Sequence, residues 1–149
     1  MSDAADLDGA LDGVSIVEVR TTASAALIPT IRAVASDLAA RADFDLDSIS
    51  DLRMAVDEAC ATLVDVAAPA SNLRCVFHVR PERIQVHAEV QADKPDSTVS
   101  TDTFGWRVLQ TLADEVEVRH HGGADGSRPT LGIRLNKRAA APGADGQDL

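Results

Sequence analysis

The order of sequence patterns along the chain predicts an α+β fold in two layers, with three main helices on a mixed, largely antiparallel sheet. A first β-branched run is followed by two long stretches with helical spacing of apolar residues, after which the apolar period changes to two. One further helical stretch then precedes two more alternating segments. Helices segregated in this way from an antiparallel-rich sheet are typical of a two-layer sandwich.

A single domain over residues 14–138 accounts for these patterns. At 149 residues the chain is long enough for one domain with a core of its own. Residues 1–13 are small and acidic, and residues 139–149 are rich in Ala, Pro, Gly and Asp. Both ends are predicted to be disordered, because neither has enough apolar side chains to join a core.

Composition limits the partners of this protein. Its formal net charge is −10, so it should repel nucleic acid and anionic membranes and attract basic proteins. The chain shows no apolar leader and no membrane-length run, which favours a cytoplasmic protein. With three Phe, one Trp and no Tyr, its core must consist mainly of Val, Leu, Ile and Ala.

The first two elements are a strand and a helix. Residues 14–20 are β-branched and partly alternating, which predicts a strand. Thr21 or Ser24 is the expected cap of a helix over residues 25–42. Pro29 falls in the first turn or two of that helix, where proline costs least.

A long amphipathic helix over residues 48–67 forms the centre of the predicted fold. Ser48 with Asp51 resembles a capping box at its start. Glu58 lies at the margin of the apolar stripe, and Thr62 follows one turn later on the same side. Two interpretations of Glu58 stay open: a carboxylate that reaches past a buried face to water, or a proton acceptor that faces a cleft. The stripe itself consists of Leu52, Val56, Ala59, Leu63 and Val66.

The next two segments predict a β-hairpin. Pro81 and Glu82 form a two-residue turn that pairs Arg80 with Arg83, and this register puts both apolar sets on one sheet face. The remaining elements are a loop, a helix and two strands, over residues 93–101, 103–113, 115–119 and 130–136.

Before any family is considered, the residues indicate little chemistry. Cys60 and Cys75 both fall at predicted core positions, as small buried hydrophobes or, alternatively, as a disulfide. There is no Walker A sequence and no nucleophile elbow. A zinc site is not expected, because the histidines lack ligand partners at metal spacing; they are His78, His87, His120 and His121.

Three segments nevertheless stand out together: DLRMAVDEAC at residues 51–60, FGWRVLQTLADEV at residues 104–116 and GIRL at residues 132–135. They resemble, in that order, the first conserved box, the helix and strand after the ATP lid, and the closing strand of the histidine-kinase-like ATPases. Within this group they resemble the anti-sigma factors of the RsbW type, which are also serine kinases. The resemblance covers about residues 14–138 and implies the Bergerat-type fold of that family.

The resemblance assigns roles to five residues. Glu58 matches the glutamate that activates the attacking serine or water, and Thr62 stands where an asparagine holds Mg²⁺. Asp93 matches the aspartate that reads adenine, but the glycines of its box are missing. Gly105 is what remains of the glycine-rich lid box, and Thr130 matches a threonine near the closing strand. The implied nucleotide site is therefore degraded, whereas the apolar frame is intact.

These features lead to an expected function. The chain should be an anti-sigma factor that binds an alternative, stress-type sigma factor, blocks transcription initiation, and is released by an anti-anti-sigma protein. No cofactor is required, although weak binding of ATP and Mg²⁺ is compatible with the remaining residues. Arg32 is a candidate partner contact or, alternatively, a solvated surface arginine. A homodimer formed through the sheet or its edge is expected, with neither nucleic acid nor a membrane as partner.

Two other functions are consistent with the same resemblance. The first is an active ATP-dependent serine/threonine kinase that phosphorylates the anti-anti-sigma protein, with Glu58 as the base. The second is a histidine-kinase-like domain that regulates something other than transcription.

Overall fold

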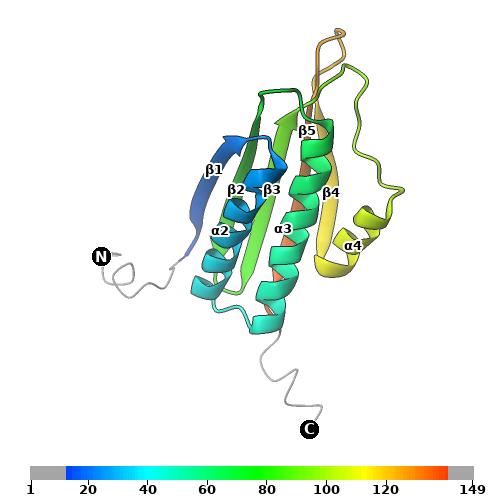
Figure 1. The fold of residues 1–149 in the computed structure, drawn as a ribbon. Helices are drawn as coiled ribbons and strands as arrows, with labels where there is room; N and C mark the ends of the chain where they lie inside the picture. Colours follow the sequence, from blue (N-terminus) through cyan, green and yellow to red (C-terminus); the bar gives the residue numbers. More distant parts are fainter. Residues whose placement is uncertain (1–12, 141–149) are drawn as a thin grey trace.

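A computed structural model describes residues 13–140 as one sheet with helices on one face (Figure 1). The predicted disorder of the two ends falls largely on residues 1–12 and 141–149, which lie outside the described residues. The elements, in chain order, are β1 (Ser15–Thr22), the 3-10 turn η1 (Ala25–Leu27), α2 (Ile28–Arg41), α3 (Leu46–Val66), β2 (Asn72–Arg80), β3 (Arg83–Gln91), α4 (Phe104–Leu112), β4 (Glu115–His121) and β5 (Thr130–Arg138).

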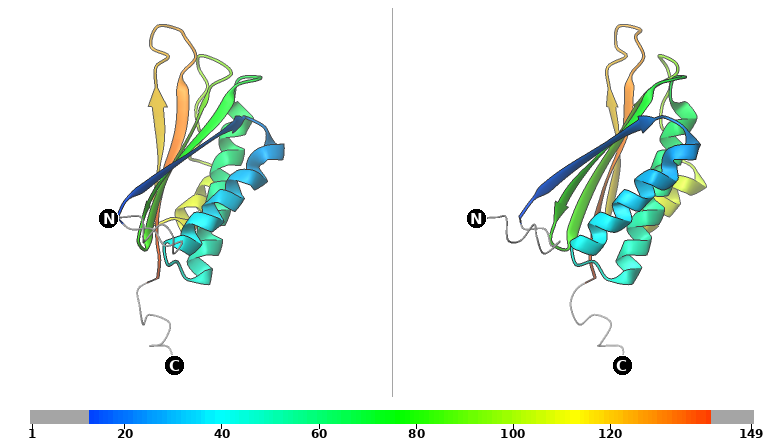
Figure 2. Two further views of the ribbon diagram at one scale, coloured as in Figure 1. Left: turned by 90° about the vertical axis from the view of Figure 1, so that its left-hand side faces the viewer. Right: turned by 60° about the vertical axis from the view of Figure 1, so that its left-hand side comes forward.

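The five strands are ordered β1-β2-β3-β5-β4, and each neighbouring pair is antiparallel. The last strand therefore inserts between β3 and β4. Figure 2 shows α2, α3 and α4 on one side of this twisted sheet, while no described element covers the other side. The predicted two-layer α+β sandwich is confirmed, and within residues 13–140 no strand pair is parallel.

The hairpin of β2 and β3 has the predicted register. Arg80 pairs with Arg83 across the two-residue turn. Glu82 adopts a left-handed φ of 62°, and its backbone N–H donates to the carbonyl of Ala42 at 2.7 Å. The turn is thus attached to the end of α2, and the apolar residues of both strands face the helices.

Helix α3 begins earlier than the sequence predicts. Its N-cap is Asp45, whose carboxylate accepts from the backbone N–H of Ser48 at 3.2 Å. Ser48 is therefore not the cap but a buried residue of the first turn. Of the two caps considered for the preceding helix, Ser24 is the one used, and it caps the short turn η1 that leads into α2.

The core lies between the sheet and the helices and consists mainly of Val, Leu, Ile and Ala, as predicted. Cys60 on α3 and Cys75 on β2 are both fully buried in it, with their Sγ atoms 3.8 Å apart. Both are free thiols. The hydrogen bond with Cys75, together with burial, raises the pKa of Cys60 well above its usual value, so the thiol stays protonated in the folded protein.

Candidate functional site

Glu58 lies at the contact between α3 and α4. It is half-buried at the edge of the apolar face of α3, as its place in the sequence predicts. The first turn of α4 packs directly against it: a Cβ added to Gly105 would lie only 2.4 Å from Oε2 of Glu58. The carboxylate therefore occupies the space that a side chain at position 105 would need, and it lies at the amino end of a helix, where negative charge is favoured.

Thr62 is brought next to Glu58. Its hydroxyl donates to the backbone carbonyl of Glu58 at 2.8 Å and lies 3.3 Å from Oε2 of the same residue. A threonine that bonds back to the preceding turn is a common local arrangement in helices. The hydroxyl therefore forms its hydrogen bonds within α3, and it would have to break them in order to bind a metal ion.

A second pair extends the site towards α2. Nη1 of Arg32 lies 2.9 Å from Oδ2 of Asp57, so a half-exposed ion pair joins α2 to α3. Arg32 is thus paired within the protein while 39% of its side chain stays exposed. The other oxygen of Asp57 is buried and has no hydrogen-bond partner among residues 13–140.

The ion pair and Glu58 border a hollow of about 480 Å³ between α2, α3 and α4. Met54, which lines this hollow, has 48% of its surface exposed, and Phe104, the residue before Gly105 in the sequence, has 79% exposed. The apolar part of the lining comes from Ala25, Ile28, Pro29, Met54, Ala61 and Val108. An apolar hollow bordered by charged groups is typical of a surface that binds another protein.

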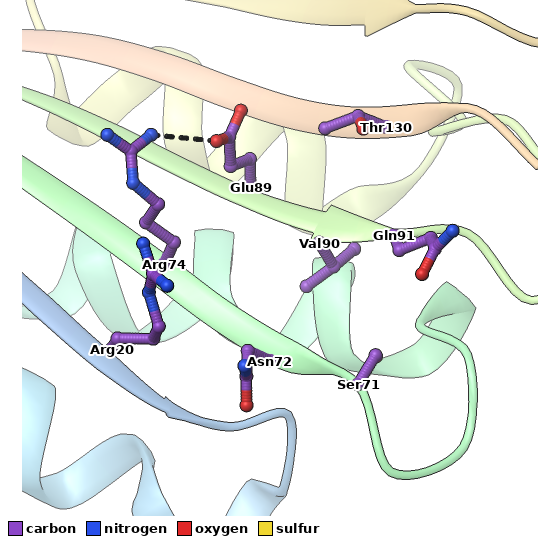
Figure 3. A pocket seen from close by; sticks show the side chains of 8 residues that line it. All are labelled: Arg20, Ser71, Asn72, Arg74, Glu89, Val90, Gln91 and Thr130. Atoms are coloured by element: carbon purple, nitrogen blue, oxygen red, sulfur yellow. Dashed lines mark hydrogen bonds and ion pairs between the residues drawn. The ribbon is translucent and has the colours of Figure 1, made fainter.

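The other two residues assigned from the resemblance lie elsewhere. The backbone N–H of Asp93 donates to the carbonyl of Val66, at the carboxyl end of α3. Thr130 begins β5 and points to the open face of the sheet, where it borders a hollow of about 320 Å³ together with Arg20 and Gln91 (Figure 3). Strand alternation explains this, because Leu131 is fully buried on the helix side and its neighbour must face outward.

The positions of these residues show how Mg²⁺·ATP would have to bind if it occupied the site that the resemblance implies. A triphosphate beside the amino end of α4 would meet the Glu58 carboxylate, which already contacts Gly105 and repels phosphate. The Thr62 hydroxyl already donates a hydrogen bond within α3. Thr130 lies on the open face of the sheet, away from the helices that carry Glu58 and Thr62. Residues 13–140 contain no group of three or more His, Cys, Asp or Glu side chains able to hold a metal. Glu58, Thr62 and Thr130 therefore do not converge on a single metal–nucleotide site in the described residues.

Sequence reasoning missed part of this site. Asp57 could not be paired with Arg32 from the sequence, because nothing in either helix encodes their crossing. Met54 and Phe104 could have been predicted as exposed apolar residues, because each is a large apolar residue outside the buried stripe of its own helix.

Comparison with known proteins agrees with this fold. Residues 21–128 match the family model described as a histidine kinase-like ATPase domain, and the chain belongs to this family. It is 35% identical over 130 residues to the anti-sigma-F factor RsbW of Mycobacterium tuberculosis, covering 87% of this chain and 77% of that protein. It is also 28% identical over 127 residues to the serine-protein kinase RsbW of Bacillus subtilis, covering 72% and 79%. The predicted resemblance to RsbW-type proteins is confirmed.

Proposed function

We propose that this protein is an anti-sigma factor that acts mainly by binding. It captures an alternative sigma factor in the cytoplasm, blocks transcription initiation, and releases it when an anti-anti-sigma protein competes. The relatives named as anti-sigma factors support this proposal. The observation that carries it is the apolar hollow bordered by Glu58 and by the Arg32–Asp57 ion pair, because such a surface suits a protein partner.

Charge supports a basic partner. The chain carries a formal charge of −10, and α3 contributes more acidic than basic side chains: Asp47, Asp51, Asp57, Glu58 and Asp65 against Arg53. A basic, DNA-binding protein is attracted to such a surface, and bound there it loses access to its own polyanion. A homodimer formed through the sheet or its edge belongs to the same proposal.

The first experiment identifies and measures the partner. The full chain is used to capture proteins from the source cell, and each captured sigma factor is then purified and titrated against it. We expect binding that Arg32→Ala weakens, because the ion pair with Asp57 holds the rim of the hollow. Arg41→Ala is the matched control, since Arg41 also pairs with an aspartate at 2.9 Å but at the other end of α2. Equal effects of both variants, or no sigma factor that binds, would contradict the proposal.

The alternative function is an ATP-dependent serine/threonine kinase, which the relatives named serine-protein kinase favour. Calorimetric titration with Mg·ATP separates the two functions. Micromolar binding, with transfer of phosphate to an anti-anti-sigma protein that Glu58→Ala abolishes, supports the kinase. Without nucleotide binding, the protein acts by capture alone. Light scattering on the same samples tests the proposed homodimer.

A further inference from the structure

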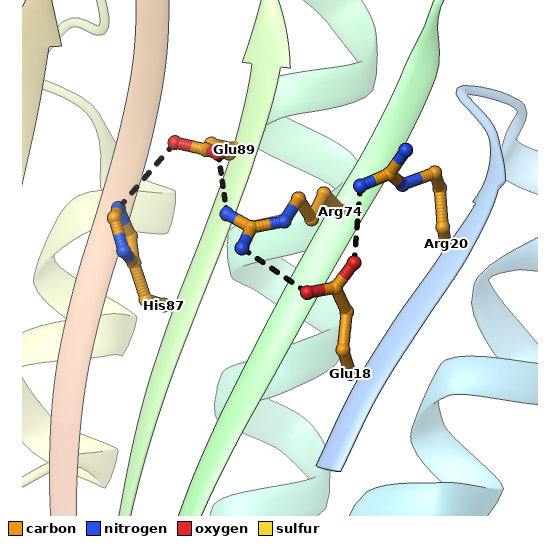
Figure 4. A network of polar contacts seen from close by, with 5 residues as sticks. All are labelled: Glu18, Arg20, Arg74, His87 and Glu89. Atoms are coloured by element: carbon orange, nitrogen blue, oxygen red, sulfur yellow. Dashed lines mark hydrogen bonds and ion pairs between the residues drawn. The ribbon is translucent and has the colours of Figure 1, made fainter. Parts of the chain in front are cut away.

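The open face of the sheet is a charged surface whose arginines are mostly paired. Figure 4 shows Arg20 and Arg74 bonded to Glu18, with Arg74 also bonded to Glu89. Further along the face, Arg119 and Arg134 both pair with Glu117. On this part of the face each of these four arginines therefore has a carboxylate partner.

At one end of the open face, arginines lie opposite other arginines instead of carboxylates. Arg80 on β2 pairs in register with Arg83 on β3, and Arg83 pairs in register with Arg138 on β5. These three side chains form the arginine row. Neighbouring strands are about 5 Å apart, so like charges lie directly opposite each other, an arrangement that destabilises a sheet. The protein has a net charge of −10, yet none of the carboxylates in residues 13–140 forms an ion pair with these guanidinium groups.

Among residues 13–140, no side chain forms a hydrogen bond or ion pair with the guanidinium group of Arg80, Arg83 or Arg138. Two acidic residues lie close to the row without forming an ion pair with it: Glu82 is in the turn between Arg80 and Arg83, and the carboxylate of Asp114 accepts from the backbone N–H of Arg138. A hollow of about 210 Å³ adjoins the row, and its lining adds side chains that hydrogen-bond; it consists of His78, Arg80, Arg83, Gln85 and Asn136.

We propose that the arginine row and its hollow are a docking site for a short acidic segment of a protein partner. Aspartate or glutamate side chains of that segment would pair with the three guanidinium groups, and its backbone would bond to the amides in the hollow. A long polyanion such as nucleic acid does not suit the site, because the rest of this molecule repels it. The site is on the sheet face opposite the hollow of α2, α3 and α4, so both surfaces can be occupied at once.

A binding experiment with a defined probe tests this proposal. The probe is a fluorescein-labelled hexa-aspartate peptide, with hexa-asparagine as the neutral control, titrated with the full chain at low and at physiological salt. In the variant R80Q/R83Q/R138Q we expect affinity for hexa-aspartate to fall about tenfold, from the loss of three exposed charge pairs. The matched control R53Q/R107Q/R128Q removes three other exposed arginines and the same net charge, and it should change affinity less than twofold.

A second measurement does not depend on the probe. Removing like charges that face each other should raise the urea midpoint of R80Q/R83Q/R138Q above that of the control variant, since the row is retained at a cost to stability. Equal affinity losses in both variants, or no binding of hexa-aspartate at low salt, would overturn the proposal.

Two further measurements distinguish an outside partner from two other possible occupants of the arginine row. If the row binds the acidic residues of the chain's own first segment, changing Asp3, Asp6, Asp8 and Asp12 to Asn in the full chain will strengthen binding of the probe. If it binds a second copy, R80Q/R83Q/R138Q will lower the mass measured by light scattering. Either result replaces an outside partner with this chain itself, and so contradicts the proposal.

Discussion

At the scale of single residues, the contact between Gly105 and Glu58 sets how closely α3 and α4 approach each other at the candidate site. Position 105 must be glycine for the Glu58 carboxylate to lie where it does, because a Cβ would come within 2.4 Å of Oε2. The carboxylate is at the flexible end of its side chain and can rotate away. The two residues should therefore be coupled in stability, although neither is essential for folding.

A double-mutant cycle measures this coupling. In the presence of Glu58, Gly105→Ala gains helix propensity but displaces the carboxylate, and the net change in unfolding free energy should be below about 1 kcal/mol. In the Glu58→Ala background the same substitution should stabilise by up to about 1 kcal/mol, because the obstruction is gone. Urea unfolding of the four proteins should give a coupling of at least about 0.5 kcal/mol. Strictly additive effects would show that the contact is absent.

His87 gives a prediction about pH. It lies over Gly132 on the open sheet face, and burial lowers its pKa below the usual 6.5; Glu89 opposes this change, while Arg119, Arg134 and Arg74 add to it. The unfolded chain therefore binds a proton at higher pH than the folded protein. Stability should be complete above about pH 6.5 and decline as the pH falls through the folded pKa.

Thermal unfolding between pH 5 and pH 8 checks this expectation. In His87→Gln the decline below about pH 6.5 should become shallower, because glutamine does not titrate there. His78→Gln is the control, since His78 is on the same face and adjoins the arginine row instead. If stability declines as steeply with falling pH in His87→Gln as in the parent protein, His87 does not contribute to the pH dependence.

At the scale of elements, the start of α3 depends on Asp45. Its carboxylate accepts from the backbone N–H of Ser48 and, at 3.0 Å, from that of Ala140, so it caps the helix and also holds the chain after β5. A hydrogen bond with the side chain of Ser48 is the main reason that the pKa of Asp45 falls to about 2, and the backbone N–H groups of Ala140 and Ser48 lower this pKa further. Because the pKa is lower in the folded state, its stabilisation is complete above about pH 4 and is lost towards pH 2.

Asp45→Ala should lower the free energy of unfolding by about 1 kcal/mol at neutral pH, as expected for the loss of an N-cap. It should also remove part of the decline between pH 4 and pH 2. Asp47→Ala is the comparison, since Asp47 is an exposed acidic residue of the first turn that does not cap the helix. Denaturant unfolding at pH 7 and pH 3 measures both effects, and equal losses in the two variants would contradict the capping role.

At the scale of the whole molecule, charge and apolar surface are distributed unevenly. The helix side carries the apolar hollow and the acidic side chains of α3, whereas the open sheet face ends in the arginine row. None of the helices in residues 13–140 is long and apolar enough to cross a membrane. The molecule thus has two surfaces of opposite character on opposite sides of one sheet.

This distribution predicts how association with a basic sigma factor depends on salt. With a net charge of −10, the association rate should fall roughly tenfold or more between about 10 mM and 500 mM salt, because screening removes the long-range attraction. The dissociation rate should change much less, since in the proposed complex it depends on short-range contacts in the hollow. Stopped-flow measurements across this range separate the two rates, and an association rate independent of salt would exclude electrostatic steering.

The sequence alone determined the elements and their pairing within the hairpin. Period-two alternation around Pro81 and Glu82 required one register, and the three-and-four spacing in residues 52–66 required one buried face. These are local rules, in which a residue's neighbours along the chain suffice. For the same reason the positions of Glu58 and Thr62, one helical turn apart, followed directly from their spacing.

Only the tertiary structure decided what these residues meet. The helix crossings that join Arg32 to Asp57 and Glu58 to Gly105, the outward direction of Thr130, and the row formed by Arg80, Arg83 and Arg138 all depend on elements far apart in sequence. The third arginine joins the row because β5 inserts beside β3, and no local pattern encodes that insertion. Packing between layers and strand order are set by the burial of the whole core, which no single stretch of sequence contains.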